Sequence, residues 1–311
     1  MPSDRISILY NPSAGMGRAL GRKIELERLL RHFEIRYDLV MTQSEEHLRQ
    51  LTRESARTYP AVVGAGGDST FHIMIGELAA AGGGADFGMI GVGSSNDIPR
   101  EFGVETLAKA CRALKDGRAR AIDLGVVREG GTVLGFFLGQ ANIGLGAYVN
   151  RFVAGLAGRR PRLARRQLLA GVLGVRRAYA TRAIPLDVGL DAGDRRREKK
   201  VAAAIFSNIR YWATGRLINP GARPDDGVLD CCLIGDCRFL RLARLARRAK
   251  NGRHVGARGV EVLRAPSFQV SSATPFAVQV DGEILRAADG RTAFSSVSFG
   301  VVPGGLRLIT P

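Results

Sequence analysis

Long apolar runs are absent from this sequence: none approaches the about 18–20 residues that a membrane-spanning helix needs, which excludes a transmembrane protein. The N-terminus, MPSDR, lacks a basic region followed by a long apolar one, so we expect no signal peptide. Cysteine is scarce. The four cysteines form no CxxC pair and accompany no clustered histidines, which argues against a zinc site or a disulfide framework and favours a reducing cytoplasm.

Two familiar phosphate-binding signatures are also missing. No GxxxxGK followed by Ser or Thr occurs, which excludes a Walker A loop. No GxGxxG follows the first expected strand, which excludes the dinucleotide fingerprint. A nucleotide site in this chain therefore has to be built differently.

Acidic residues are absent from two long segments. Residues 130–186 contain nine Arg and no acid, and residues 237–260 contain seven Arg, Lys250 and no acid. The formal net charge is +17, and outside these segments the remaining basic residues balance the 29 acids. Such a local excess of positive charge indicates a polyanionic partner, which could be nucleic acid, an anionic membrane surface or phosphates. The alternative is an arginine-rich surface that is simply solvated.

The patterning changes near residue 120 of the 311, a length that suits about two domains. Before that point apolar strands alternate with helical segments, which predicts a parallel α/β sheet with helices on both faces. After it, short strands separated by turns predict an antiparallel sandwich. The expected elements include strands at 6–10, 37–41, 61–65, 87–92 and 133–141, and helical insertions at 151–179 and 238–251.

Three turns rich in glycine or hydroxyl side chains follow strands of the first part: NPSAG at 11–15, GGDST at 66–70 and GSSND at 93–97. Such turns gather at the carboxyl ends of parallel strands, where ligands bind. Glycine lets backbone amides approach phosphate oxygens, and the following helix N-terminus adds positive potential. Three of them in one domain favour a nucleotide site.

These turns and three later motifs together resemble the diacylglycerol kinase catalytic family, which includes bacterial lipid kinases, sphingosine kinases and ceramide kinases. The matching segments run in family order over nearly the whole chain: NPSAG at 11–15, GGDST at 66–70, GSSNDIPR at 93–100, QANIGLG at 140–146, PDDGVLD at 224–230 and QVDGE at 279–283. The resemblance implies a Rossmann-like ATP-binding domain over 1–120 and an antiparallel β-sandwich lipid-binding domain over 121–300, with the active site in the cleft between. It leaves room for residues 301–311 to return to the first domain.

The family transfers the γ-phosphate of ATP to a lipid hydroxyl with Mg²⁺, which requires positioning, charge neutralisation and a base. The resemblance implies that Glu283 or Asp281 is this base, with Glu283 favoured, and that Asp68 belongs to the catalytic set. It places a structural Mg²⁺ on the Asp226 side chain and the carbonyls of Arg223 and Val228. The residues expected around the nucleotide are Asn11, Pro12, Ser13, Gly15, Thr42, Gly66, Gly67, Asp68, Ser69, Thr70, Ser94, Asn96 and Asp97.

Some of these residues also have ordinary structural interpretations. Asp-Gly-Glu is a common hairpin turn, and Asp68 can be a helix N-cap. Ser69 replaces a glycine of the family motif, which would strain the loop if that position needs a positive φ and would add a phosphate contact if it does not. Ile73 stands where many relatives carry an acid, and His72 is expected to be a packed or capping residue.

Basic segments 151–182 and 238–253 mix arginine with apolar residues at helical spacing, a pattern typical of helices that lie on anionic membranes. We therefore predict a cytoplasmic lipid kinase associated with the inner face of the membrane, and we rank nucleic acid low because few aromatic residues accompany the arginines. A homodimer stays open. Two alternatives remain: a soluble kinase related to the NAD kinase and phosphofructokinase group, and a catalytically silent lipid- or nucleic-acid-binding homologue.

Overall fold

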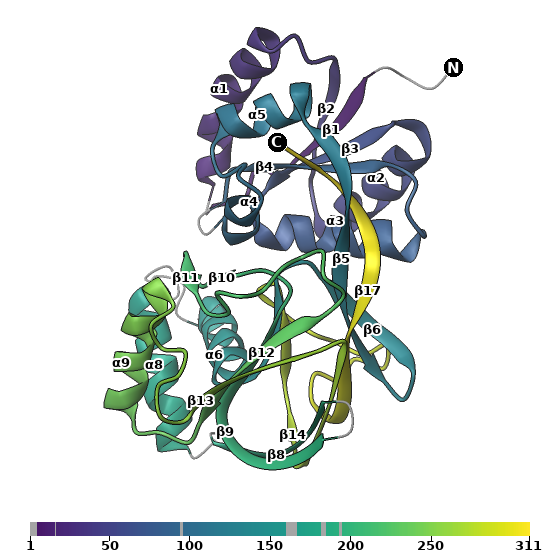
Figure 1. Ribbon diagram of the computed structural model, residues 1–311. Coiled ribbons are helices and arrows are strands. Elements are labelled where there is room, and N and C mark those ends of the chain that lie inside the picture. The colour runs from purple at the N-terminus through teal and green to yellow at the C-terminus, as the bar shows by residue number, and fades with distance from the viewer. Residues whose placement is uncertain (1–4, 16, 94–95, 160–166, 182–184, 193–194) are drawn as a thin grey trace.

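The structure is a computed structural model that describes residues 5–15, 17–93, 96–159, 167–181, 185–192 and 195–311. Two domains lie one above the other, and two long strands run through both of them (Figure 1). The predicted fold class, an α/β domain followed by an antiparallel sandwich-like domain, is confirmed. No described helix is long and apolar enough to span a membrane.

The first domain is built on parallel strands in the order β4–β3–β1–β2, with α1 packed against α5 and α2 against α3 (Figure 1). Capping side chains begin two helices: Ser44 accepts from the His47 amide at 3.1 Å, and Thr106 accepts from the Lys109 amide at 3.2 Å. The elements are β1 (Ile6–Tyr10), α1 (Arg18–His32), β2 (Tyr37–Met41), α2 (Glu45–Thr58), β3 (Ala61–Gly66), α3 (Asp68–Ala80), β4 (Asp86–Gly91), α4 (Asp97–Glu101) and α5 (Leu107–Asp116).

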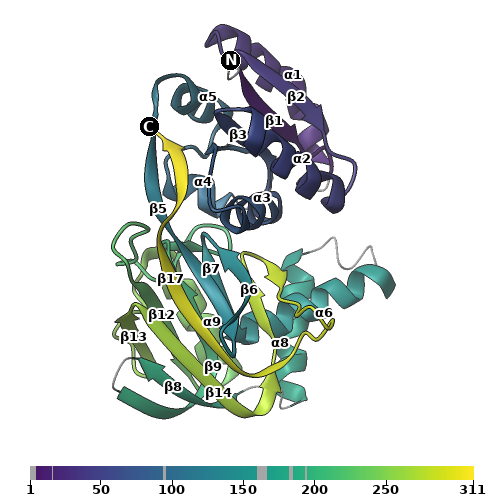
Figure 2. The same ribbon diagram turned by 90° about the vertical axis from the view of Figure 1, so that its right-hand side faces the viewer.

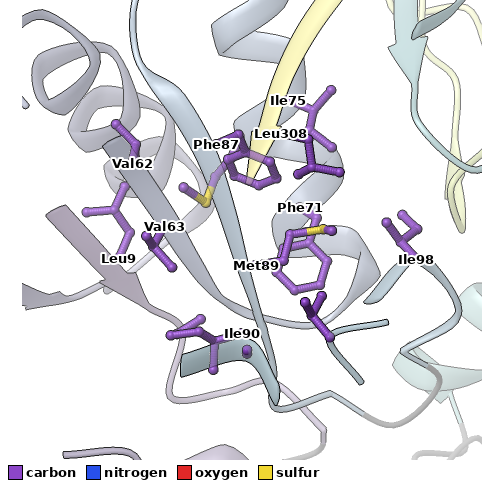
Figure 3. Packing of buried hydrophobic residues seen from close by; sticks show 14 of the residues in the cluster. Leu9, Val62, Val63, Phe71, Ile75, Phe87, Met89, Ile90, Ile98 and Leu308 are labelled. Atoms are coloured by element: carbon purple, nitrogen blue, oxygen red, sulfur yellow. The ribbon is translucent and has the colours of Figure 1, made fainter. Parts of the chain in front are cut away.

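An antiparallel ribbon of β5 (Arg118–Glu129) and β17 (Phe294–Thr310) joins the domains (Figures 1 and 2). A register shift between Val302 and Leu306 divides the ribbon into a part in each domain. Beyond the shift, Leu308 is in register with Phe87 of β4, and it packs among the side chains of the first domain's core (Figure 3). The C-terminal end of the chain thus completes the sheet of the first domain.

The second domain is an antiparallel sheet folded around its own core, with strand order β16–β15–β7–β9–β8–β14–β17 and β12–β13 paired onto β9. Phe206 and Phe299 stack in this core with ring centroids 4.0 Å apart. The elements are β6 (Thr132–Phe137), β7 (Gln140–Gly144), β8 (Leu186–Ala192), β9 (Arg195–Ser207), β10 (Tyr211–Trp212), β11 (Arg216–Leu217), β12 (Leu229–Gly235), β13 (Val260–Ala265), β14 (Ser267–Phe276), β15 (Val278–Val280) and β16 (Glu283–Ile284).

The sequence of strand β12 is almost continuously apolar because both faces of the strand are buried. Leu229, Cys231 and Leu233 face the sandwich core, whereas Cys232 and Ile234 face a separate core under the helices. A strand covered on both faces has no polar side to alternate with. All four cysteines are free and buried, as expected for small apolar side chains in these cores.

Helices α6 (Leu145–Arg159), α8 (Gln167–Ala180) and α9 (Phe239–Arg248), followed by the short helix η1 (Ala249–Asn251), cover the outer face of this sheet (Figure 1). The helical insertions expected over 151–179 and 238–251 are confirmed in the described residues: α6, which begins earlier at Leu145, and α8 form the first, and α9 and η1 form the second. The strand expected over 133–141 was wrong. It ends at Phe137 and a new strand begins at Gln140, because the intervening amides bond to a side chain, described below, and not to a neighbouring strand.

Candidate active site

One cavity of about 980 Å³ lies between the domains and extends under the helices of the second domain. Its upper end is polar and is formed by the turns after β1 and β3. Its lower end is apolar and is formed by α6, α8 and α9 above strands β9 and β12. Of the residues predicted for the site, the cavity is lined by Asn11, Ser13, Gly15, Gly67, Asp68, Ser69, Thr70, Asp97 and Asp281.

The glycine turns of the first domain pack directly on one another. A Cβ on Gly93 would lie 2.6 Å from the Cα of Gly67, and one on Gly66 would lie 2.3 Å from the hydroxyl of Thr70. Asn11 reaches across from the first turn and donates to Thr70 Oγ1 at 3.0 Å. Only glycine allows such close approach, so these turns form one surface that leads into the N-terminus of α3.

Asp68 begins α3 and lines the cavity. Burial, with the negative charges of Asp97 and Asp281 nearby, raises its pKa to about 7. The backbone amides of Asp97 and Ile98 donate to this carboxylate. Its Oδ1 is buried and has no hydrogen-bond partner among the described residues. The negative charge of this carboxylate is disfavoured by its surroundings, and a bound cation would stabilise it.

Asp281 and Gly282 form the two-residue turn of the β15–β16 hairpin, both with positive φ, as a type I′ turn requires. The Asp281 side chain, only 1% exposed, accepts hydrogen bonds from the amides of Leu138 (2.9 Å), Gly139 (2.9 Å) and Gln140 (2.8 Å). These amides are the ones that interrupt the strand expected over 133–141. With both oxygens engaged in this way, Asp281 holds the β6–β7 turn against the hairpin.

Glu283 is exposed and does not line the cavity, although the preceding Gly282 does, and its Oε1 accepts a hydrogen bond from Ser69 Oγ at 2.7 Å. Ser69 lies in the first turn of α3 and has no positive φ. The serine in place of the family glycine therefore causes no strain, and its hydroxyl adds a contact. Ile73, at the position where many relatives carry an acid, is buried in the core of the first domain.

Two further carboxylates join the domains. Asp97 accepts from the amides of Thr214 (2.9 Å) and Gly215 (2.6 Å), in the turn between β10 and β11. Glu101 accepts from the Arg210 side chain at 2.9 Å and from its amide at 3.0 Å. Both carboxylates hold the 210–215 segment of the second domain against α4.

The other residues predicted for the nucleotide site lie around the cavity without lining it. Thr42 is buried and its hydroxyl donates to the Tyr10 carbonyl at 3.3 Å. Asn96, in the left-handed region, packs its amide against the end of β4. Pro12 and Gly66 are part of the turns. Ser94 lies outside the described residues.

The segment predicted to bind a structural Mg²⁺ has a different partner. Asp226 Oδ2 is 2.5 Å from Arg264 Nη2, and its Oδ1 accepts from the Val228 amide at 3.3 Å. Arg223 forms an ion pair with Asp225 at 3.4 Å. Among the described residues no cluster of three His, Cys, Asp or Glu side chains is arranged for a metal. With a guanidinium already on Asp226, this donor set does not fit a divalent cation.

A cation bound with the nucleotide fits the site better. Mg²⁺ in phosphoryl-transfer sites is held by one or two carboxylates and by the substrate's phosphates, so a large protein cluster is not needed. Asp68, whose Oδ1 has no hydrogen-bond partner among the described residues, would supply such a carboxylate at the turns expected to bind phosphate.

Several residues of the cavity were not predicted. Gln140 and Asn142 on β7 are buried polar side chains that line it, and Asn142 donates to Gln279 of β15. Polar residues within a buried strand were the available signal. The apolar end, with Val153 of α6, Val175 of α8 and Leu242 of α9, could not be found in advance because it needs three helices to meet over one sheet.

Helices α8 and α9 contact each other at the apolar end of the cavity (Figure 1). Val172 of α8 and Phe239 of α9 line the cavity and are also exposed to solvent. Leu240, which follows Phe239, is 76% exposed. Both helices thus carry solvent-exposed apolar side chains at this end of the cavity.

Comparison with known proteins agrees with this architecture. Residues 5–127 match the diacylglycerol kinase catalytic domain, and residues 139–310 match the YegS C-terminal NAD kinase beta sandwich-like domain. A probable lipid kinase YegS-like of Pseudomonas aeruginosa is 28% identical over 284 residues, which cover 87% of this chain and 83% of that protein. A diacylglycerol kinase of Mycobacterium tuberculosis is 27% identical over 310 residues, covering 99% and 95%.

The fold is also that of solved structures. A putative diacylglycerol kinase from Bacillus anthracis superposes with a TM-score of 0.77 at 17% identity, over 100% of this chain and 96% of that one. These findings and the two-domain site define a kinase enzyme with a catalytic α/β domain and a sandwich-like second domain. The chain belongs to the diacylglycerol kinase catalytic family, with a C-terminal domain of the YegS type.

Proposed function

We propose that this kinase transfers the γ-phosphate of ATP to a primary hydroxyl of a membrane lipid. The observation that carries the proposal is the single cavity that joins the phosphate-binding turns of the first domain to an apolar chamber in the second. A soluble kinase of the NAD kinase or phosphofructokinase group would need polar groups where this chain has Val153, Val175 and Leu242. The lipid kinase is therefore the better fit.

The nucleotide phosphates bind at the turns around Gly67 and Gly93, where the N-terminus of α3 provides amides and positive potential. Asp68 would hold the Mg²⁺ that accompanies the nucleotide, and the ion would supply neutralisation of phosphate charge. A triphosphate at these turns would be close to Ser69, whose hydroxyl donates to Glu283.

Glu283 accepts the proton of the lipid hydroxyl as the hydroxyl oxygen bonds to the γ-phosphorus and the bond to the bridging oxygen of ADP breaks. The Glu283 carboxylate is exposed beside the cavity, next to Gly282 of its lining, and its Oε1 is engaged by Ser69. Asp281 is the poorer base because three backbone amides occupy its oxygens. We assign it the role of positioning the hairpin that carries Glu283.

The apolar chamber accommodates the hydrocarbon chains of the substrate, as in a typical lipid site with a few polar groups at one end. Diacylglycerol, ceramide and sphingoid bases all present a primary hydroxyl on apolar chains. Because Val172 and Phe239 line the chamber and are also exposed, we propose that the chamber has its mouth between α8 and α9 and that such chains enter there from a bilayer.

The surface around this mouth suits an anionic membrane. Exposed arginines lie on the same two helices as the exposed Val172, Phe239 and Leu240, or directly before α9: Arg176, Arg177, Arg238, Arg244, Arg247 and Arg248. Each basic residue near an anionic surface contributes about 1 kcal/mol. We propose that the described parts of segments 151–182 and 238–253 dock on the inner face of the cytoplasmic membrane. Arg165 and Arg166 lie outside the described residues.

The decisive experiment supplies radiolabelled ATP and Mg²⁺ with a panel of diacylglycerol, ceramide and sphingosine in anionic micelles, followed by chromatography. We expect one lipid class to be labelled. Labelling of NAD or a sugar phosphate with no labelled lipid would support the soluble alternative, and no labelling of any acceptor would support a silent homologue.

A further inference from the structure

The turn at residues 224–228 is held by charged groups from two directions. On one side Arg264 of β13 lies against Asp226, with Nη2 2.5 Å from Oδ2. On the other side Asp123 of β5 accepts from the Gly227 amide at 2.7 Å and from the Gly304 amide at 2.9 Å. The turn is thus fixed between a guanidinium and a buried carboxylate.

Strand pairing explains why Arg264 reaches this turn. In the antiparallel pair β12–β13, Arg264 is directly opposite Asp230. Its Nε is 3.4 Å from Asp230 Oδ2, and its Nη2 extends to Asp226 at the beginning of the same segment. Asp230 is 3% exposed at its side chain, and its Oδ2 has this ion pair but no hydrogen bond among the described residues. One guanidinium therefore forms ion pairs with two acids of the PDDGVLD segment, Asp226 and Asp230.

We propose that Arg264 takes the place of a structural divalent cation in this chain. Its single delocalised charge lies against both Asp226 and Asp230, and its planar donors fix the turn as a bound metal would. A carboxylate already paired to arginine is a poor Mg²⁺ ligand, because binding would require the ion pair to break or two cations to lie close together. The turn is therefore ordered without metal.

The turn is connected to the catalytic hairpin by hydrogen bonds. Asn208 Nδ2 donates to the Asp123 carbonyl at 2.8 Å and to the Leu138 carbonyl at 3.1 Å. The Leu138 amide in turn donates to Asp281. Arg264 is thus a positioning residue whose loss loosens the turn first and the hairpin of Glu283 through it.

The test compares the full chain with Arg264→Met, Asp226→Asn and the control Arg307→Met, all without nucleotide. Arg307 is a similarly exposed strand arginine with one acidic partner, Asp86, at 2.7 Å. We expect the wild-type Tm to be the same in EDTA and in millimolar Mg²⁺. We expect Arg264→Met to lower the Tm by about 2–4 °C, more than the control, and to recover part of the loss in Mg²⁺.

Equilibrium dialysis against Mn²⁺ gives a second readout that does not depend on activity. Wild type and Asp226→Asn are expected to bind the same number of Mn²⁺ ions. This comparison tests whether Asp226 binds a divalent cation even if Arg264→Met fails to fold. Two results would overturn the proposal: a wild-type Mn²⁺ ion that Asp226→Asn loses, or an Arg264→Met variant as stable as the control in EDTA.

Discussion

Ser69 Oγ donates a hydrogen bond to Glu283 Oε1 at 2.7 Å, across 214 residues of sequence and from one domain to the other. The serine belongs to the turn that we propose binds phosphate, and the glutamate to the hairpin that we propose carries the base. The contact joins these two parts of the proposed site, and it exists because α3 accepts serine at its second residue without strain.

Replacing Glu283 tests the assignment of the base. Glu283→Gln is expected to lower kcat by about 10²–10⁴-fold, since the amide can still accept from Ser69 but cannot take the lipid proton. The KM for ATP should not change. Ser69→Gly, which removes only the hydroxyl contact, is the control and should cost less than about tenfold. Steady-state transfer of radiolabelled phosphate measures both, and a fully active Glu283→Gln enzyme would remove Glu283 from the mechanism.

Asp281→Asn tests whether that residue acts through structure. Asparagine tolerates the positive φ of this position, but it has one acceptor oxygen for three backbone amides. We expect a loss of about 1–3 kcal/mol in the free energy of unfolding, measured by urea denaturation. Unchanged stability together with lost turnover would show that Asp281 takes part in the chemistry.

The raised pKa of Asp68, about 7 in the folded protein, makes stability depend on pH. Because this pKa lies above the unfolded value, the stabilising contribution is present below about pH 4 and is lost as pH rises through about 7. Asp68→Asn should therefore be more stable than wild type at pH 8, by about 1–3 kcal/mol, and equal to it at pH 4, while losing activity. Thermal unfolding across this range measures the difference, and an equal offset at both pH values would contradict it.

Gly171 offers a way to fill the apolar chamber. It lines the cavity on α8, and a Cβ there would have no atom within 4 Å. Gly171→Phe should fold normally, yet lower turnover of long-chain lipids by at least about tenfold, with ATP binding unchanged. Gly155 of α6 is equally open and lies away from the cavity, so Gly155→Phe is the matched control. Equal activity of the two variants would place the lipid chains elsewhere.

Arginines on α9 are expected to strengthen binding to anionic vesicles. Arg244→Gln with Arg247→Gln should weaken it by about 2 kcal/mol, or about thirtyfold, at low salt. The effect should fade at high salt because exposed charges are screened. Arg28→Gln with Arg31→Gln, on α1 of the other domain, is the control. Vesicle sedimentation measures both pairs, and equal losses would mean that the overall charge, and not this face, attracts the membrane.

The alternation of apolar strands and helices specified the first domain closely, since β1 and β2 begin and end at the predicted residues. Prediction was poorer where tertiary contacts compete with local pattern. The sequence of residues 133–141 predicts one strand, but the amides of Leu138 and Gly139 in the middle of it donate hydrogen bonds to the Asp281 carboxylate. The Mg²⁺ expected at Asp226 stays a prediction from the resemblance, and only the pairing of β12 with β13 shows that Arg264 lies against this carboxylate.

By itself the sequence determined the class of fold, the order of its elements and the chemical types gathered at the turns, because periodicity and glycine placement act over a few residues. Only the tertiary structure decided which of these groups meet. It set Ser69 against Glu283, enclosed Asp281 among three amides and joined α6, α8 and α9 into a chamber. Such contacts depend on strand register and on packing between distant segments, and these are properties of the whole chain.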